Sequence, residues 1–475
     1  MVNAMRGERS IAKGAALAAC FIFAAPAFAQ SDPAHLSLVA GYKAAFTCSA
    51  HFNAGRSVDQ IAGDELNRIY PDYREALGEL PDAVIDEDAK TVSVAYAEGA
   101  PPRISAWRPR LGCAQLATGA DASAAALLPK ITHFRVKTPM RKAGAEPAEL
   151  FSTVVETPAL DPVVAAGFDR ATYGEGTETT ALLVIKDGVA VAEKYRDGFG
   201  PDVPQRTWSV AKSIGATVIG AAVMDGLIDV SEPAGLEAWS GPGDPRAAIK
   251  IEDLMHMSSG LDSGPAGNRT DDVYFGGGRV VDHAITRRLI AEPGTRWTYA
   301  NNDTMTMMRA LRERMKSDEA YLRYPFERVL APLGMNHTFL ETDWNGDFIM
   351  SSQVWTTARD LARLGLLYLG DGVWNGQRLL PEGWSEFVST PAPAQPPLAR
   401  PDGRVLPGYG AQFWLFGERH GLSEGSYAAM GNRGQYVMIV PVRNIVIVRR
   451  GFDDNGGAQF DIAKFSADVL AALGE

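Results

Sequence analysis

Two β-strand signals at opposite ends of one long region constrain the fold most strongly. The first is a hairpin signal over 181–194, in which apolar, β-branched runs flank Asp187-Gly188, a dipeptide that tolerates the positive φ of a tight turn. The second covers 436–450 near the C-terminus and is followed by a helical pattern over 460–473. Helical patterns lie between the two signals. We therefore expect an α/β fold in which both ends meet in one antiparallel sheet flanked by helices.

A separate small module is expected before this region, over residues 30–150. Its patterns predict an α+β arrangement of two helices and a strand, at 36–46, 58–69 and 91–97. The stretch 138–149 contains two prolines and a glycine and is predicted to be a linker to a larger domain over 151–475. No chemistry can be assigned to the module from its residues.

The start of the chain, residues 1–29, is typical of an export signal. Basic residues precede an apolar stretch over 14–25, and Ala27-Phe28-Ala29 fits a cleavage site. A lipoprotein signal ending at Cys20 is the alternative; ordinary cleavage is favoured because the apolar run continues past that cysteine. The stretch is too short to span a bilayer of about 30 Å. We expect a periplasmic or secreted protein with no stable membrane insertion after signal removal.

Cleavage would leave two cysteines, Cys48 and Cys113. Two thiols in an oxidising compartment usually pair, so a structural disulfide is predicted. The alternative is two separately buried thiols.

The chain is acidic, with a formal net charge of −11. Removal of the basic export signal makes the mature chain more acidic still. Acidic charge without basic clusters argues against nucleic acid and anionic membrane surfaces as partners.

A serine and a lysine three residues apart begin an apolar helical run. Ser209 and Lys212 would share one face of that helix and could touch. A serine hydroxyl needs a base to become a nucleophile, and a lysine can serve if desolvation or a neighbouring cation lowers its pKa. The N–H of Ser209 at the first turn could also bind an oxyanion. The spacing alone is not specific, because Ser10 and Lys13 share it; an N-capping serine with a solvated lysine is the alternative.

A second pair, Tyr299 and Asn301, lies in the turn-like segment 293–301. Tyr299 could move a proton between Ser209, Lys212 and a leaving group, while Asn301 could hydrogen-bond the lysine or a substrate amide. The alternative is a core tyrosine and a turn asparagine.

These motifs together resemble the serine β-lactamase and D-alanyl-D-alanine peptidase superfamily, which carries S-x-x-K, then Y-x-N, then a strand bearing K-T-G or H-x-G. The resemblance covers roughly 170–475. Further family-like segments follow in the expected order at 254–261, 330–335, 357–372 and 374–381. The chain is most similar to class C β-lactamases, related esterases and 6-aminohexanoate-dimer hydrolases. The resemblance implies a β-lactamase/transpeptidase-like fold with a mostly helical subdomain.

The third family motif is altered. Residues 431–435 (GNRGQ) stand where K-T-G or H-x-G is expected. By position, Asn432 matches the lysine or histidine, Gly434 lets substrate lie against the strand, and the N–H of Gln435 is the second oxyanion donor. Arg433 either holds a substrate carboxylate or points outward from its strand, and the second interpretation is favoured.

The sequence contains no other complete motif for a catalytic, metal or cofactor site. The segment 421–425 (GLSEG) matches a nucleophile elbow, but no histidine follows Ser423 as that triad requires. Histidine and cysteine spacings indicate no metal, and there is no phosphate loop or dinucleotide fingerprint. No cofactor is expected.

The sequence thus predicts an exported serine hydrolase that cleaves a small ester, amide or short peptide-like substrate through a Ser209 acyl-enzyme. The uncharged Asn432 favours esters or small amides over β-lactams. A β-lactamase or D-Ala-D-Ala carboxypeptidase is the alternative enzyme. A non-catalytic envelope protein that binds peptidoglycan or a partner is the alternative from another class.

Overall fold

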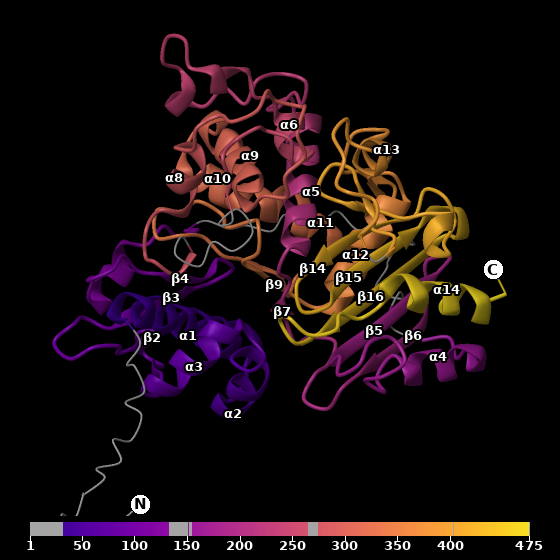
Figure 1. The fold of residues 1–475 in the computed structure, drawn as a ribbon, viewed down its shortest axis with the longest axis horizontal. Helices are drawn as coiled ribbons and strands as arrows, with labels where there is room; N and C mark the ends of the chain where they lie inside the picture. The colour runs from indigo at the N-terminus through magenta and orange to yellow at the C-terminus, as the bar shows by residue number, and fades with distance from the viewer. Residues whose placement is uncertain (1–31, 133–150, 152–153, 265–273, 402, 475) are drawn as a thin grey trace, which may run out of the picture.

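The computed structural model describes residues 32–132, 151, 154–264, 274–401 and 403–474 (Figure 1). The predicted export signal, with Cys20, and the predicted linker at 138–149 lie outside the described residues. Within the described ranges, no helix is long and apolar enough to cross a membrane.

The centre of the larger region is a seven-stranded antiparallel sheet (Figure 1). In spatial order its strands are β12 (Gly408–Tyr409), β13 (Trp414–Leu415), β14 (Tyr427–Gly431), β15 (Gln435–Val440), β16 (Ile445–Gly451), β5 (Thr179–Lys186) and β6 (Val189–Tyr195). β16 pairs with β5, with Ile447 opposite Val184. The turn between β5 and β6 places Asp187 and Gly188 at φ 51° and 76°. The prediction that the two ends share one antiparallel sheet is confirmed.

Both faces of this sheet are buried because alternate side chains pack against different helices. Leu182, Val184 and Met438 lie in an apolar cluster with α14 (Ile462–Ala472). On the other face, Leu183 and Val437 share a core with α12 (Ala358–Leu369) and α5 (Val210–Met224). α5 is buried almost throughout, which places its N-terminus inside the molecule.

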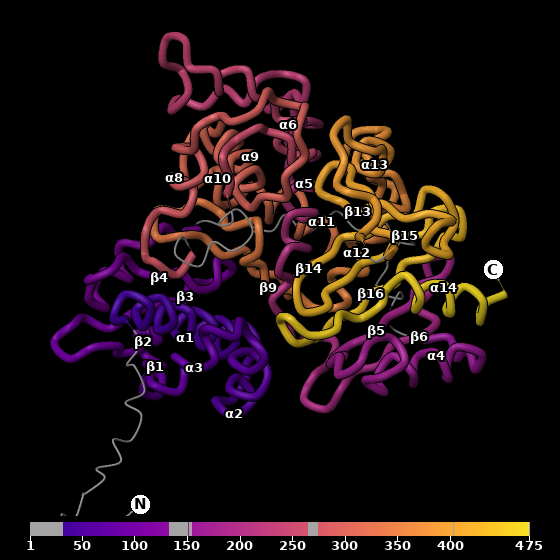
Figure 2. Tube along the Cα trace, in the orientation of Figure 1, coloured from indigo at the N-terminus to yellow at the C-terminus, as the bar shows by residue number. Residues whose placement is uncertain are grey.

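Helices that lie between β6 and β12 in the sequence form a mostly helical subdomain beside the sheet, as predicted (Figures 1 and 2). Its elements are α6 (Ile251–Met255), α8 (Val280–Ile285), α9 (Asn301–Arg314), α10 (Asp318–Pro325) and α11 (Ala331–Leu333), with α13 (Trp384–Ser389) nearer the sheet. A small three-stranded sheet, β7 (Gln205–Arg206), β9 (Val354–Thr356) and β8 (Phe339–Leu340), leads into α5.

The N-terminal residues form an α+β unit. It contains α1 (Pro33–Ala54), α2 (Val58–Gln60), α3 (Pro71–Glu79) and an antiparallel sheet of β1 (Val84–Asp86), β2 (Thr91–Val94), β3 (Arg103–Arg108) and β4 (Gly112–Gln115). The helix predicted over 58–69 is only partly right, because the α-helix passes into a π-turn over Ile61–Glu65 and ends at Leu66. Pro71 then starts α3, since a proline lacks the N–H that the first turn leaves unpaired anyway.

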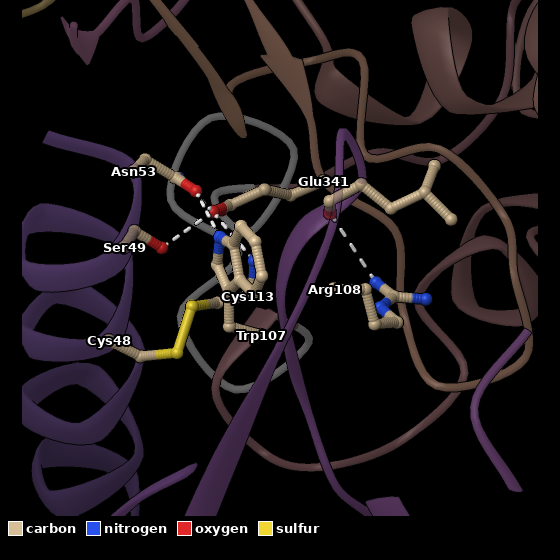
Figure 3. Close-up of a disulfide and its surroundings, with 8 residues drawn as sticks. Cys48, Ser49, Asn53, Trp107, Arg108, Cys113 and Glu341 are labelled. Carbon is tan, nitrogen blue, oxygen red and sulfur yellow. Dashed lines mark hydrogen bonds between the residues drawn. A yellow bond between two sulfur atoms is a disulfide. The ribbon is translucent and has the colours of Figure 1, made fainter. Parts of the chain in front are cut away.

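A disulfide joins α1 to β4 through Cys48 and Cys113, as predicted (Figure 3). Beside it, Glu341 from the larger region accepts hydrogen bonds from Ser49 Oγ at 2.6 Å and from the Cys113 N–H at 3.1 Å. Burial raises the pKa of Glu341 to about 7. The carboxyl group of Glu341 therefore joins the N-terminal unit to the larger region at a buried polar contact.

Reduction of the Cys48–Cys113 bridge is expected to destabilise the N-terminal unit. The two cysteines are 65 residues apart, and a loop of that length is worth about 4 kcal/mol of free energy of unfolding in the chain-entropy description. Urea unfolding with and without reductant measures the difference. Cys48→Ser/Cys113→Ser should match the reduced protein and show no further response to reductant; equal unfolding midpoints in all samples would contradict the prediction.

Candidate active site

The loop before α5 places Ser209 at the N-terminus of a buried helix. The Thr207 N–H donates to the carbonyl of Val354 at 2.8 Å, which ties the loop to β9. Trp208 has φ 50°, a left-handed conformation that costs a bulky residue of order 1–3 kcal/mol. Such strain persists only where the surroundings hold it. Here it turns Ser209 to the first position of the helix.

Lys212 is 1% exposed, and its Nζ lies 3.2 Å from Ser209 Oγ. It also donates to Asn301 Oδ1 at 2.6 Å and to the carbonyl of Ser351 at 2.8 Å. Burial, and then the positive charge of Arg206, lowers the pKa of Lys212 to about 7. Desolvation and a neighbouring cation, the two conditions that let a lysine act as a base, are therefore both present.

The partners of Lys212 differ in what they can accept or donate. Asn301 Oδ1 and the Ser351 carbonyl are acceptors only, so they take the two protons of a neutral amine. The lone pair of that amine is then left for the third partner, the hydroxyl of Ser209. The hydrogen bonds around Lys212 therefore orient the lone pair of its neutral form toward the hydroxyl of Ser209.

Tyr299 is half-buried and hydrogen-bonded to Ser209, and its ring centre lies 5.0 Å from Lys212 Nζ. Burial raises the pKa of Tyr299 well above its usual range. Its phenol is therefore neutral and is suited to donate a proton rather than to take one. Burial has opposite consequences for the two groups: the lysine becomes a neutral base, and the tyrosine stays a neutral acid.

The family-like segment at 254–261 holds the Tyr299 loop in place. The Thr298 N–H donates to the Met257 carbonyl at 2.8 Å. Ser259 Oγ donates to Asp303 at 2.7 Å in the first turn of α9, and burial raises the pKa of Asp303 to about 7. This segment therefore positions Tyr299 and Asn301 without entering the pocket itself.

The end of β14 lies against Ser209. A Cβ added to Gly431 would meet the Thr207 carbonyl oxygen at 2.3 Å and the Ser209 nitrogen at 3.1 Å, so only glycine allows this approach. The carbonyl of Ser426, just before β14, accepts a hydrogen bond from the Phe416 N–H, just after β13, and therefore faces the β13 edge of β14. Backbone groups alternate between strand edges, so the N–H of Met430, four residues on, faces the same edge. The β13–β14 pairing ends at Ala428, which leaves this edge open to the pocket at Met430.

The predicted residues of the third motif are placed differently. Asn432 lines the pocket, in the turn between β14 and β15, and its side chain contacts Asn455. Gly434 lies away from the nucleophile, where a Cβ would meet Arg449 at 1.6 Å. Gln435 pairs with Gly431 and its side chain is bonded inside the sheet, outside the pocket lining. The glycine that lies beside Ser209 is therefore Gly431, which precedes the turn between β14 and β15. The sequence position had suggested Gly434, which follows Arg433 at the end of that turn.

The expected outward orientation of Arg433 is wrong. Its side chain is 1% exposed and donates to the carbonyl oxygens of Asp453 at 3.2 Å and Asn67 at 2.9 Å. The residue has φ 57°, which turns its side chain beneath the β14–β15 hairpin. A turn residue with positive φ does not follow the alternation of a strand, and alternation was the basis of the prediction.

A cavity of about 470 Å³ joins these groups. Its lining includes Ser209, Tyr299 and Asn301, with aromatic walls such as Trp208 and Trp414. Sequence reasoning missed Met430, Arg206 and Tyr70 in this lining and the Ser351 carbonyl beside Lys212, and no local pattern marks any of them. Among the described residues, no three His, Cys, Asp or Glu side chains gather where they could hold a metal ion.

The sheet, its covering helices and the helical subdomain make up the β-lactamase/transpeptidase-like fold of serine hydrolases. Residues 164–450, more than half of the chain, match the family model described as Beta-lactamase. The chain therefore belongs to the Beta-lactamase family.

Relatives within this family carry several names. The chain is 27% identical over 292 residues to a 6-aminohexanoate-dimer hydrolase from Paenarthrobacter ureafaciens, covering 58% of this chain and 73% of the relative. A penicillin-binding protein homologue from Caulobacter crescentus shares the fold with a TM-score of 0.52 at 14% identity, over 67% of this chain and 99% of the other. A family VIII carboxylesterase has a TM-score of 0.52 at 14% identity, over 68% and 99%.

Proposed function

We propose that this chain cleaves ester or amide bonds of small substrates through an acyl-enzyme on Ser209. The observation that carries the proposal is the contact of Ser209 Oγ with Lys212 Nζ at 3.2 Å, where burial lowers the lysine pKa to about 7. A lysine with an ordinary pKa would be protonated at neutral pH and could not accept the serine proton.

In the first step, the neutral Lys212 takes the hydroxyl proton of Ser209 as its Oγ attacks the carbonyl carbon of the substrate. Negative charge develops on the carbonyl oxygen, and the N–H of Ser209 at the start of α5 donates to it. For the second donor we replace Gln435 with the N–H of Met430. Gln435 is outside the pocket, whereas Met430 lies on the open strand edge that faces it.

In the second step, the tetrahedral intermediate collapses and the bond to the leaving group breaks. Tyr299 gives its phenolic proton to the departing alkoxide or amine, and the ammonium of Lys212 replaces that proton. A water molecule then attacks the acyl-enzyme, passes a proton to the Lys212–Tyr299 pair and releases the acid with Ser209 restored.

The lining of the pocket favours esters or small amides over β-lactams. Asn432 brings no charge to the third motif, and among the described residues that line the cavity Arg206 alone is a cation. The walls are aromatic, which suits apolar acyl or leaving groups. The relative's name, 6-aminohexanoate-dimer hydrolase, supports an amide substrate, and the carboxylesterase neighbour supports an ester.

A substrate panel tests this preference. It compares a p-nitrophenyl ester, a 6-aminohexanoate dimer, a D-alanyl anilide and a chromogenic cephalosporin on the full chain. Turnover of the ester or the dimer is expected to exceed cephalosporin turnover. Rapid cephalosporin hydrolysis would establish the β-lactamase alternative, anilide cleavage would establish the carboxypeptidase, and inertness toward every compound would favour a non-catalytic envelope protein.

We also infer that the protein is exported. The Cys48–Cys113 disulfide is consistent with an oxidising compartment, and the residues before it are typical of an export signal. Cell fractionation and N-terminal sequencing of the mature protein test the inference. A start at Gln30 is expected; a lipid-modified Cys20 or a retained N-terminus would contradict ordinary cleavage.

Replacing Gly431 with alanine is expected to reduce kcat by on the order of 10²-fold, the effect of losing one oxyanion donor. The added Cβ would meet the Thr207 carbonyl at 2.3 Å, so the end of β14 must move away from Ser209. Steady-state kinetics on the best ester measures the loss. Gly200→Ala is the matched control, because nothing lies within 4 Å of its added Cβ. Unchanged kcat in Gly431→Ala would contradict the placement of the oxyanion site.

A further inference from the structure

The N-terminal unit supplies part of the wall of the catalytic pocket. Tyr70, between the π-turn and α3, lines the same cavity as Ser209 and Tyr299. Its backbone is extended, with φ −50° and ψ 131°, and the following Pro71 restricts it to that region. The aromatic ring of Tyr70 therefore stands on a rigid turn rather than on a free loop.

The segment that carries Tyr70 is held against the catalytic sheet by its own backbone. The carbonyl of Asn67 accepts from Arg433 at 2.9 Å, and the carbonyl of Arg68 accepts from the Asn455 N–H at 2.9 Å. The Arg68 side chain pairs with Glu178 at 2.7 Å. Arg433 belongs to the same turn as Asn432, and Asn455 contacts the side chain of Asn432, so the contacts bring the N-terminal unit directly to the edge of the pocket.

A second contact reaches the loop of the nucleophile. Phe46 of α1 lies 5.9 Å from the ring of Trp208, the residue immediately before Ser209. The guanidinium of Arg206 contacts both rings, 4.4 Å from the centre of the Phe46 ring and 3.9 Å from that of Trp208. Tyr42 meets the pocket residue Phe275 at 5.0 Å. The N-terminal unit thus packs on the catalytic site over several elements, and its position relative to the pocket is determined by buried contacts.

We propose that Tyr70 is a specificity-determining residue, with which the N-terminal unit closes one end of the pocket and limits the length of the substrate. The inference rests on the proposed function and deepens it by naming the substrate class as compact esters or amides with a short or aromatic group at that end. An aromatic ring supplies a large, stiff wall. Its removal opens the pocket toward the N-terminal unit, so longer groups gain most.

Covalent labelling measures this effect without a known substrate. The second-order labelling rates of Ser209 are compared for an ethyl and a decyl fluorophosphonate on the full chain. The ratio of the decyl rate to the ethyl rate is expected to rise about tenfold in Tyr70→Ala, the size of effect that pocket shape has on selection between hydrophobic groups. Tyr70→Phe keeps the ring and should keep the wild-type ratio.

Phe52→Ala is the matched control, because Phe52 is an aromatic residue of the same unit that packs on Trp107 and lies outside the pocket lining. Its ratio should equal that of the wild type. If the ratio in Tyr70→Ala stays within twofold of the wild-type ratio and the thermal melting curve is unchanged, the proposed role of Tyr70 is overturned, while the proposed function still stands. A wild-type protein that no fluorophosphonate labels at Ser209 would overturn the proposed function and, with it, this inference.

Discussion

Ser209→Ala is expected to lower kcat/KM on the best ester or amide substrate by about 10⁴-fold or more, as loss of the nucleophile does in other serine hydrolases. The variant lacks the oxygen that forms the acyl-enzyme, while the N–H of residue 209 and the pocket walls remain. Steady-state kinetics measures the loss. Intact-protein mass spectrometry after fluorophosphonate treatment should show one adduct on the wild type and none on Ser209→Ala.

Ser423→Ala is the control for this prediction, because Ser423 belongs to the competing G-x-S-x-G match. It lies outside the lining of the catalytic cavity, and its variant should keep both the adduct and the activity. Full activity or labelling in Ser209→Ala, or their loss in Ser423→Ala, would show that the nucleophile is elsewhere.

The rate of acylation is expected to rise with pH through about 7 and to level off above about 8. In the proposed mechanism the neutral amine of Lys212 is the base, and the pKa of Lys212 is lowered to about 7 by burial and by Arg206. Below this pH the lysine is protonated and cannot accept the serine proton, so the rate falls as pH falls. Fluorophosphonate labelling rates between pH 5 and pH 10 measure the profile.

Lys212→Met keeps the apolar stem and removes the base. Its labelling rate should fall on the order of 10³-fold, the middle of the range for general-base catalysis, and the rise near pH 7 should disappear. Lys250→Met is the control, since Lys250 is solvent-accessible and pairs with Glu252 at 3.0 Å. In Arg206→Gln the midpoint of the labelling-rate profile should lie at higher pH than in the wild type, because Lys212 loses a neighbouring cation that lowers its pKa. A midpoint near 10 in the wild type would contradict a lysine base with a lowered pKa.

Spacing within single elements made much of the site predictable. Ser209 and Lys212 lie one helical turn apart, so any helix there brings them together. Tyr299 and Asn301 lie two apart at the start of α9. Their contact with the first pair depends on how α5 and α9 pack, and it was expected only from the resemblance to a known family. The four strands β5, β6, β15 and β16 were predictable for a similar reason, since apolar strand runs and the Asp187-Gly188 turn are local signals, whereas β12, β13 and β14 were not predicted.

The third motif shows where local reasoning fails. Asn432, Gly434 and Gln435 were matched to family positions by counting from the following strand. The residue that touches Ser209 is Gly431, because the chain turns at 432–434 and Arg433 adopts a positive φ. Which residue of a strand meets a distant helix depends on where the hairpin turns and on how the sheet packs, and neither is encoded in spacing.

The sequence by itself determined the local geometry of the nucleophile and its base, the antiparallel pairing of the two ends of the domain, and the cysteines available to pair. These depend on contacts between near neighbours or on a regular period. Only the tertiary structure decided that Lys212 is buried, that Gly431 and Met430 line the cavity beside Ser209, and that Tyr70 of the N-terminal unit lines the same cavity. Each of these depends on desolvation or on contact between segments far apart in the chain, which exist only after packing.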